Sequence, residues 1–82
     1  MSAVKDVVEV LARALTDHPD QVAVNESQHR GTTLVELYVA PGELGRVIGK
    51  QGRTAAALRT LAATAGEKEG KTVTLEVRDG RP

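Results

Sequence analysis

Apolar residues recur at intervals of three and four near the start of the chain, at Val4, Val7, Val8, Leu11, Ala12 and Leu15. This spacing places their side chains along one face of an α-helix. Ser2 is a suitable N-cap, and Pro19 cannot continue a helix because it lacks an amide hydrogen. The pattern predicts an amphipathic helix over residues 3–17, whose apolar stripe packs into the core.

Two segments of alternating polarity follow this helix. Their inward-facing positions are Val22, Val24, Val35, Leu37 and Val39. A period of two is typical of strands that bury one face. Between the segments, Arg30-Gly31 supplies a turn, because glycine readily adopts a positive φ. We expect an antiparallel hairpin with strands at about residues 21–29 and 32–40.

Two helices are predicted next. Pro41 presets φ for a first helical turn, and Glu43 would lie at the positive end of that helix, so residues 41–48 are expected to be helical. Residues 54–65 are rich in alanine and leucine. Gly66 is the expected C-terminal stop of this second, longer helix.

Residues 71–78 alternate again and predict the last strand, completing the order helix, strand, strand, helix, helix, strand. Roughly thirty residues separate the second and third strands, enough for the crossover that parallel neighbours require. The pattern therefore predicts a two-layer α+β domain, with helices on one face of a three-stranded mixed sheet. We expect one domain over residues 1–82, with its core at about 3–78.

Composition and motif spacing argue against several classes of protein. The chain has no cysteine, hence no disulfide, thiolate nucleophile or zinc knuckle. Its apolar stretches are too short to span a bilayer or to form a signal peptide. His18 and His29 lack partners at metal or triad spacing, so we interpret both as surface histidines. We expect a cytoplasmic protein that is not an enzyme and has no metal, cofactor or membrane contact.

Charge is balanced overall but unevenly distributed. The chain has 11 basic and 11 acidic residues. Residues 44–66 contain no acid and four basic residues, which are Arg46, Lys50, Arg53 and Arg59. A basic segment on an otherwise acidic protein suits a phosphate-bearing partner. An ordinary solvated helix face would have the same composition, so charge alone leaves both readings open.

Residues 49–52 read Gly-Lys-Gln-Gly and lie between the two predicted helices. This glycine content predicts about one Gly-x-x-Gly by chance, and a second one occurs at Gly42 and Gly45. The context favours residues 49–52, which follow an apolar pair and lie within the basic segment. Glycines let a sugar-phosphate chain approach the backbone, and amides at the start of a helix can face phosphate oxygens.

The run Val47-Ile48-Gly49-Lys50-Gln51-Gly52-Arg53 resembles the loop of KH domains, which clamp four nucleotides. The element order is similar to the type II KH arrangement, and the chain is similar to the small bacterial single-KH proteins of the KhpA family. The resemblance implies a single-stranded RNA-binding protein with RNA-chaperone or post-transcriptional roles. It also implies a homodimer, or a heterodimer with a larger KH-containing RNA-binding protein.

The same resemblance implies the positions of the RNA contacts. The expected RNA-binding residues are Arg46, Val47, Ile48, Gly49, Lys50, Gln51, Gly52, Arg53 and Thr54. The expected groove has an apolar floor that includes Val47, Ile48 and Leu58, with Arg59 nearby and Arg30 of the hairpin closing the opposite wall. A single site of four nucleotides binds weakly, on the order of micromolar, which favours an oligomer.

Other functions remain open at this point. Residues 54–65 could serve as the recognition helix of a helix-turn-helix DNA binder, although alanine is poorly suited to reading base edges. A degenerate KH fold could act only as a dimerisation scaffold, which the intact loop disfavours. A Walker A loop would need glycine at Leu44 and serine or threonine at Gln51, so a nucleotide-binding enzyme is not expected. With Tyr38 as the only aromatic residue, base-stacking RNA modules are also disfavoured.

Overall fold

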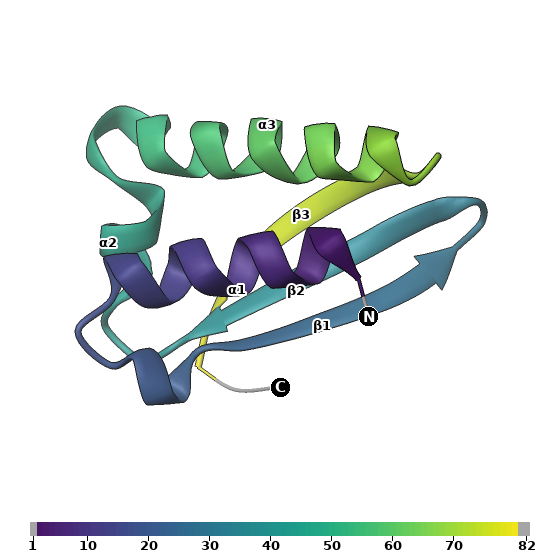
Figure 1. The fold of residues 1–82 in the computed structure, drawn as a ribbon. Helices are drawn as coiled ribbons and strands as arrows, with labels where there is room; N and C mark the ends of the chain where they lie inside the picture. Colours follow the sequence, from purple (N-terminus) through teal and green to yellow (C-terminus); the bar gives the residue numbers. More distant parts are fainter. Residues whose placement is uncertain (1, 81–82) are drawn as a thin grey trace.

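The computed structural model describes residues 2–80 and has the predicted order of elements (Figure 1). The helices and strands are α1 (Ala3–Leu15), η1 (Pro19–Gln21), β1 (Ala23–His29), β2 (Thr32–Val39), α2 (Leu44–Ile48), η2 (Lys50–Gly52), α3 (Arg53–Lys68) and β3 (Thr72–Asp79). Within residues 2–80, no helix is long and apolar enough to cross a membrane.

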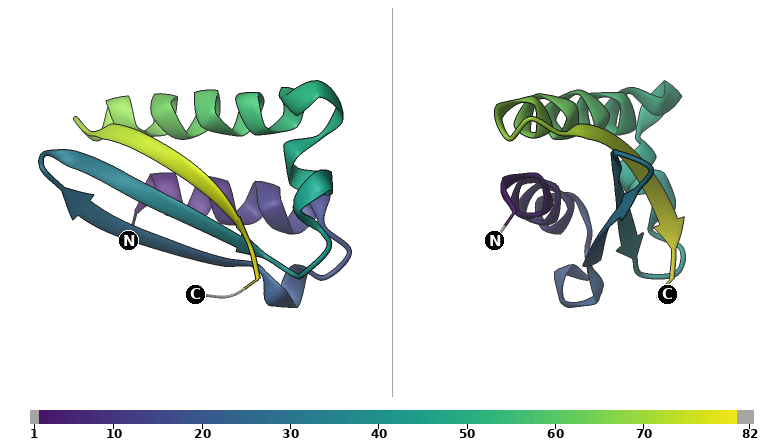
Figure 2. Two further views of the ribbon diagram at one scale, coloured as in Figure 1. Left: turned by 180° about the vertical axis from the view of Figure 1, so that it is seen from behind. Right: turned by 90° about the vertical axis from the view of Figure 1, so that its right-hand side faces the viewer.

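The three strands form one sheet in the order β1-β2-β3. β1 and β2 are antiparallel, from Ala23 opposite Tyr38 to His29 opposite Thr32. β2 and β3 are parallel, because the chain between them crosses over through α2 and α3. Figure 2 shows α1 and α3 side by side on one face of the sheet. The expected two-layer α+β fold with a mixed sheet is confirmed.

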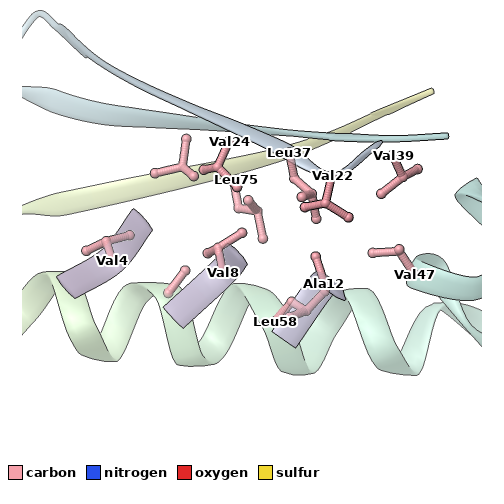
Figure 3. Packing of buried hydrophobic residues seen from close by; sticks show 12 residues of the cluster. Val4, Val8, Ala12, Val22, Val24, Leu37, Val39, Val47, Leu58 and Leu75 are labelled. Carbon is pink, nitrogen blue, oxygen red and sulfur yellow. The ribbon is translucent and has the colours of Figure 1, made fainter. Parts of the chain in front are cut away.

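The core lies between the sheet and the two long helices (Figure 3). Its members come from every main element and include Val4, Val8, Ala12, Val24, Leu37, Val39, Val47, Leu58, Ala62 and Leu75. Each fully buried valine or leucine side chain stabilises the fold by about 1.5–3 kcal/mol relative to exposure. The stripe of α1 is therefore mainly a core surface, and the helix ends at Leu15 because Thr16 is extended.

The chain before α2 differs from the prediction. Residues 40–43 form a turn in which the amide of Glu43 donates to the carbonyl of Ala40 at 3.0 Å. Pro41 precedes Gly42, whose φ is +87°. Proline followed by a glycine of positive φ favours a type II turn. Helix α2 consequently begins at Leu44, and the expected start at Pro41 is wrong.

The end of α3 also differs from the prediction. Gly66 does not stop the helix but lies buried within it, where an added Cβ would be 2.4 Å from Cγ2 of Val73. The helix continues to Lys68, and Gly70 adopts the positive φ of +69° that terminates it. The amide of Lys71 donates back to the carbonyl of Gly66 at 2.8 Å. Gly66 thus serves close packing of α3 against β3, and Gly70 serves the helix end.

Candidate nucleic-acid interface

The loop of residues 49–52 lies at one end of the molecule, where α2 turns into α3 (Figure 1). Three of its residues have positive φ: Gly49 at 74°, Gln51 at 58° and Gly52 at 72°. Such values are unfavourable for most side chains. The two glycines therefore make this sharp connection between two helices possible.

Gly49 is constrained by packing as well as by its backbone angles. A Cβ built on it would lie 2.2 Å from Oγ1 and 2.7 Å from Cβ of Thr54. The first residues of α3 therefore lie directly against the glycine. At Gly52, by contrast, an added Cβ would meet nothing within 4 Å. Gly49 holds the loop closed, while Gly52 faces open space.

The loop places two successive backbone amides at the start of the short helix η2. The amide of Gly49 donates to the carbonyl of Gly45 at 2.8 Å, and that of Gly52 donates to the carbonyl of Gly49 at 3.2 Å. Lys50 and Gln51 are the first two residues of η2, and amides at the start of a helix have no acceptor within that helix. Successive amides near the start of a helix can bind an anion. The loop has the geometry of a small anion-binding site.

The four cations of the basic segment do not contribute equally. Arg46 is turned toward acids, with Nη2 at 2.8 Å from Oδ2 of Asp17 and Nε at 3.7 Å from Oε2 of Glu43. Lys50 and Arg59 are exposed and form no ion pair with any described residue. Arg53 donates to Oε1 of Gln51 at 3.0 Å. The charge available to an incoming phosphate comes mainly from Lys50, Arg53 and Arg59.

The expected apolar floor is only partly present at the surface. Val47 and Leu58 are buried members of the core cluster, so they offer no surface to a base in this structure. Ile48 is 37% exposed beside the loop. Its side chain is thus the accessible apolar contact, and the two buried residues support it from the core.

The hairpin turn that carries Arg30 lies far from the loop. Figures 1 and 2 show the β1–β2 turn and the α2–α3 connection at opposite ends of the long axis of the molecule. That axis measures 33 Å. Arg30 therefore does not form a wall beside residues 49–52, and this part of the expected groove is absent.

Glu43 is a further residue at this end of the molecule whose surroundings were not predicted. Its side chain is only 7% exposed, and its two carboxylate oxygens accept the amide hydrogen of Asp17 at 2.9 and 3.2 Å. His18 Nδ1 also contacts the carboxylate. The Asp17 amide, with help from His18, lowers the pKa of Glu43, and the bond to Glu43 raises the pKa of His18. His18 is therefore exposed, as expected, but it has Glu43 as a partner.

No sequence pattern would have identified this contact, because Glu43 and Asp17 are 26 positions apart. Within residues 2–80, no group of three or more histidine, cysteine or acidic residues is placed to hold a metal ion. The arrangement around the loop is suited to binding an anion through amides and cations.

Comparison with known proteins points to one family. The family described as "KhpA/KhpB, KH domain" matches residues 5–77. The RNA-binding protein KhpA of Aquifex aeolicus is 53% identical over 77 residues, which are 94% of this chain and 98% of that protein. The RNA-binding protein KhpA of Mycobacterium bovis is 48% identical over 80 residues, 96% of each chain.

A solved structure has the same fold. It is the crystal structure of Era in complex with MgGDPNP and nucleotides 1506–1542 of 16S ribosomal RNA. The TM-score is 0.64 at 23% identity, and the match covers 93% of this chain and 29% of that one. At this level of identity the similarity concerns the fold alone.

Proposed function

Because this chain belongs to the KhpA/KhpB KH-domain family, we propose that it binds single-stranded RNA at residues 49–52. The observation that carries the proposal is the loop geometry, in which positive φ values at Gly49, Gln51 and Gly52 accompany two successive amides, those of Lys50 and Gln51, at the start of η2. These amides lie beside an exposed lysine and near the start of α3, where negative charge is stabilised. The relatives named as RNA-binding proteins support the same class of ligand.

In the proposed mechanism, about four unpaired nucleotides pass the loop. Their phosphates accept hydrogen bonds from the loop amides and interact with Lys50 and Arg53, while Thr54 keeps the loop closed against Gly49. Bases contact exposed Ile48 and the side of α3 that carries Arg59. Phosphate contacts position the strand, and base edges provide any sequence preference.

The corresponding cellular role is that of a cytoplasmic RNA chaperone or post-transcriptional regulator. Nothing in the loop selects one RNA, since backbone amides and cations contact features common to all sequences. Crosslinking bound RNA in cells and sequencing it tests this role. Recovery of a reproducible RNA set supports it, and the absence of crosslinked RNA contradicts it.

The site itself is tested by the double substitution Lys50→Asp with Gln51→Asp. Affinity for a short single-stranded RNA, measured by fluorescence anisotropy, should fall at least about tenfold, because carboxylates repel phosphate. The loop is exposed, so the free energy of unfolding should change by less than about 0.5 kcal/mol. Aspartate tolerates the positive φ found at Gln51.

A matched control separates the site from the overall charge. Arg30→Asp with Thr72→Asp makes the same change in net charge at the hairpin end of the sheet, where both residues are exposed. This variant should keep nearly full affinity. Unaltered affinity in the loop variant, or equal losses in both variants, would show that residues 49–52 are not the site.

We also propose that the protein self-associates, since a second site raises the affinity for one RNA strand. The proposed contact surface is a hollow of about 420 Å³ between α1 and α3, lined by Asp6, Val7, Val10, Leu11 and Leu61. Val10 is 67% exposed and Leu61 47% exposed. Exposed aliphatic side chains that line one hollow are typical of a protein contact.

Sedimentation equilibrium tests self-association. The unmodified protein should be a dimer at micromolar concentration, and Leu61→Glu should be a monomer because it would bury an unpaired charge. Thr74→Glu, at an exposed position of β3, is the control and should remain a dimer. A monomeric unmodified protein would exclude the homodimer and leave a larger KH-containing protein as the partner to test.

A further inference from the structure

Glu43 is the most enclosed acidic side chain near the loop, yet it lies outside the Gly-Lys-Gln-Gly motif. Only 7% of its side chain is exposed. Its carboxylate accepts two contacts from the amide of Asp17 and one from His18 Nδ1. A carboxylate is removed from water at a cost unless such donors compensate for it. The donors around Glu43 therefore offset the cost of burying its carboxylate.

These contacts join two distant parts of the chain. Asp17 and His18 belong to the segment that leaves α1, whereas Glu43 is the residue immediately before α2. α2 has only five residues, too few to be stable alone, so tertiary contacts must set its orientation. In the described structure, Glu43 holds one end of α2, and the burial of Val47 holds the other.

Two backbone hydrogen bonds span α2 between Glu43 and the loop. The carbonyl of Glu43 accepts the amide of Arg46 at 3.0 Å, and the carbonyl of Gly45 accepts the amide of Gly49 at 2.8 Å. Gly49 in turn lies against Thr54 with no room for a side chain. A change in the direction of α2 would therefore move Gly49 and the amides of Lys50 and Gln51 that follow it.

Asp17 and Glu43 also form ion pairs with Arg46. Nη2 of Arg46 lies 2.8 Å from Oδ2 of Asp17, and Nε of Arg46 lies 3.7 Å from Oε2 of Glu43. Asp20, like Glu43 and Asp17, carries a negative charge that raises the pKa of His18. Glu43 thus interacts with both the backbone that leaves α1 and a side chain of α2. Loss of its charge would release Arg46 from one of its two partners.

We infer that Glu43 is a positioning residue for RNA binding, because its carboxylate holds α2 in the orientation that presents the amides of Lys50 and Gln51. The inference rests on the proposed function at residues 49–52. Glu43 itself does not touch RNA in this arrangement. It acts through α2.

Glu43→Gln tests the inference, with Glu36→Gln as a matched control. Glu36 is also a well-bonded acid, which accepts from Asn25, Tyr38 and Arg78 within the sheet. At a temperature where both variants are folded, Glu43→Gln should bind short single-stranded RNA at least fivefold more weakly. Glu36→Gln should bind like the unmodified protein, even where it is less stable.

Nuclear magnetic resonance distinguishes a positioning role from a role in stability alone, because it reports the surroundings of each loop amide in the folded protein. Glu43→Gln should shift the amide resonances of Gly49 and Gly52 before RNA is added, while Glu36→Gln should leave them in place. His18→Ala removes one contact to Glu43 at an exposed residue. It replaces Glu43→Gln as the test variant if Glu43→Gln does not fold. It should weaken RNA binding about twofold to threefold and shift the same resonances less.

The outcomes separate this inference from the proposed function. Normal RNA affinity and unchanged Gly49 and Gly52 resonances in folded Glu43→Gln would overturn the positioning role and leave only a role in stability. If the Lys50→Asp, Gln51→Asp variant loses RNA binding in the same assay, the proposed site stands without Glu43. If that variant binds normally, the proposed site itself is wrong.

Discussion

Two turns at opposite ends of the molecule have nearly the same φ values. In the hairpin, Arg30 and Gly31 have φ values of 52° and 79°, and in the loop Gln51 and Gly52 have values of 58° and 72°. Both pairs place a polar residue before a glycine in the left-handed region. These φ values alone therefore do not distinguish the proposed RNA-binding loop from an ordinary turn.

The difference lies in what surrounds each pair. The hairpin turn joins neighbouring strands and follows directly from His29 opposite Thr32. A Cβ on Gly31 would meet nothing within 4 Å. The Gln51-Gly52 pair is preceded by Gly49, which packs on Thr54, and by α2, whose start is held by Glu43. One turn is specified by its own residues, and the other is held in place by distant contacts.

Of the changes that test this comparison, Gly49→Ala should have the largest effect on stability and RNA binding. Its φ of 74° and ψ of 176° are accessible essentially only to glycine, and the added methyl group would collide with Thr54. We expect a loss of about 3 kcal/mol in the free energy of unfolding and at least tenfold weaker RNA binding. Urea denaturation and fluorescence anisotropy measure the two quantities.

Gly31→Ala is the matched control at the hairpin. It should cost only about 1 kcal/mol, since the left-handed conformation is unfavourable for alanine but no atom obstructs the methyl group. RNA affinity should not change. Equal effects of the two substitutions on RNA binding would show that the two turns do not differ in the way described.

A smaller effect is expected from pH at the loop end, through Glu43 and His18. Because the pKa of Glu43 is lowered from 4.5, its stabilising contribution is present above that value and is lost as the pH falls through the lowered pKa. Because the pKa of His18 is raised from 6.5, its contribution is present below that value and is lost as the pH rises through the raised pKa. Their contact is therefore strongest between these two ordinary values.

Thermal unfolding at several pH values measures this contribution. His18→Ala should remove part of the decrease in stability that the unmodified protein shows as the pH rises above 6.5. The effect is small because His18 is largely exposed and its interactions are screened by water. Adding His18→Ala to Glu43→Gln should cause little further change, and an equally large change in that background would contradict the pairing.

Much of the fold could be predicted from the sequence because its signals are local. Alternation at Val35, Leu37 and Val39 identified β2, and the Arg30-Gly31 turn identified the hairpin. The Gly-Lys-Gln-Gly run between two helices indicated the candidate site. By contrast, Pro41 and Gly66 were assigned to the wrong roles. Proline before glycine suits a turn as well as a helix start, and a glycine can end a helix or pack closely inside one.

The sequence by itself determined the order of the elements, the mixed sheet and the place of the glycine loop, since period, turn residues and chain length act over short distances. Only the tertiary structure decided which parts of the predicted site are accessible. It buried Val47 and Leu58, separated the Arg30 turn from the loop and paired Glu43 with Asp17 across 26 positions. These outcomes depend on which surfaces meet after folding, and no local pattern encodes that.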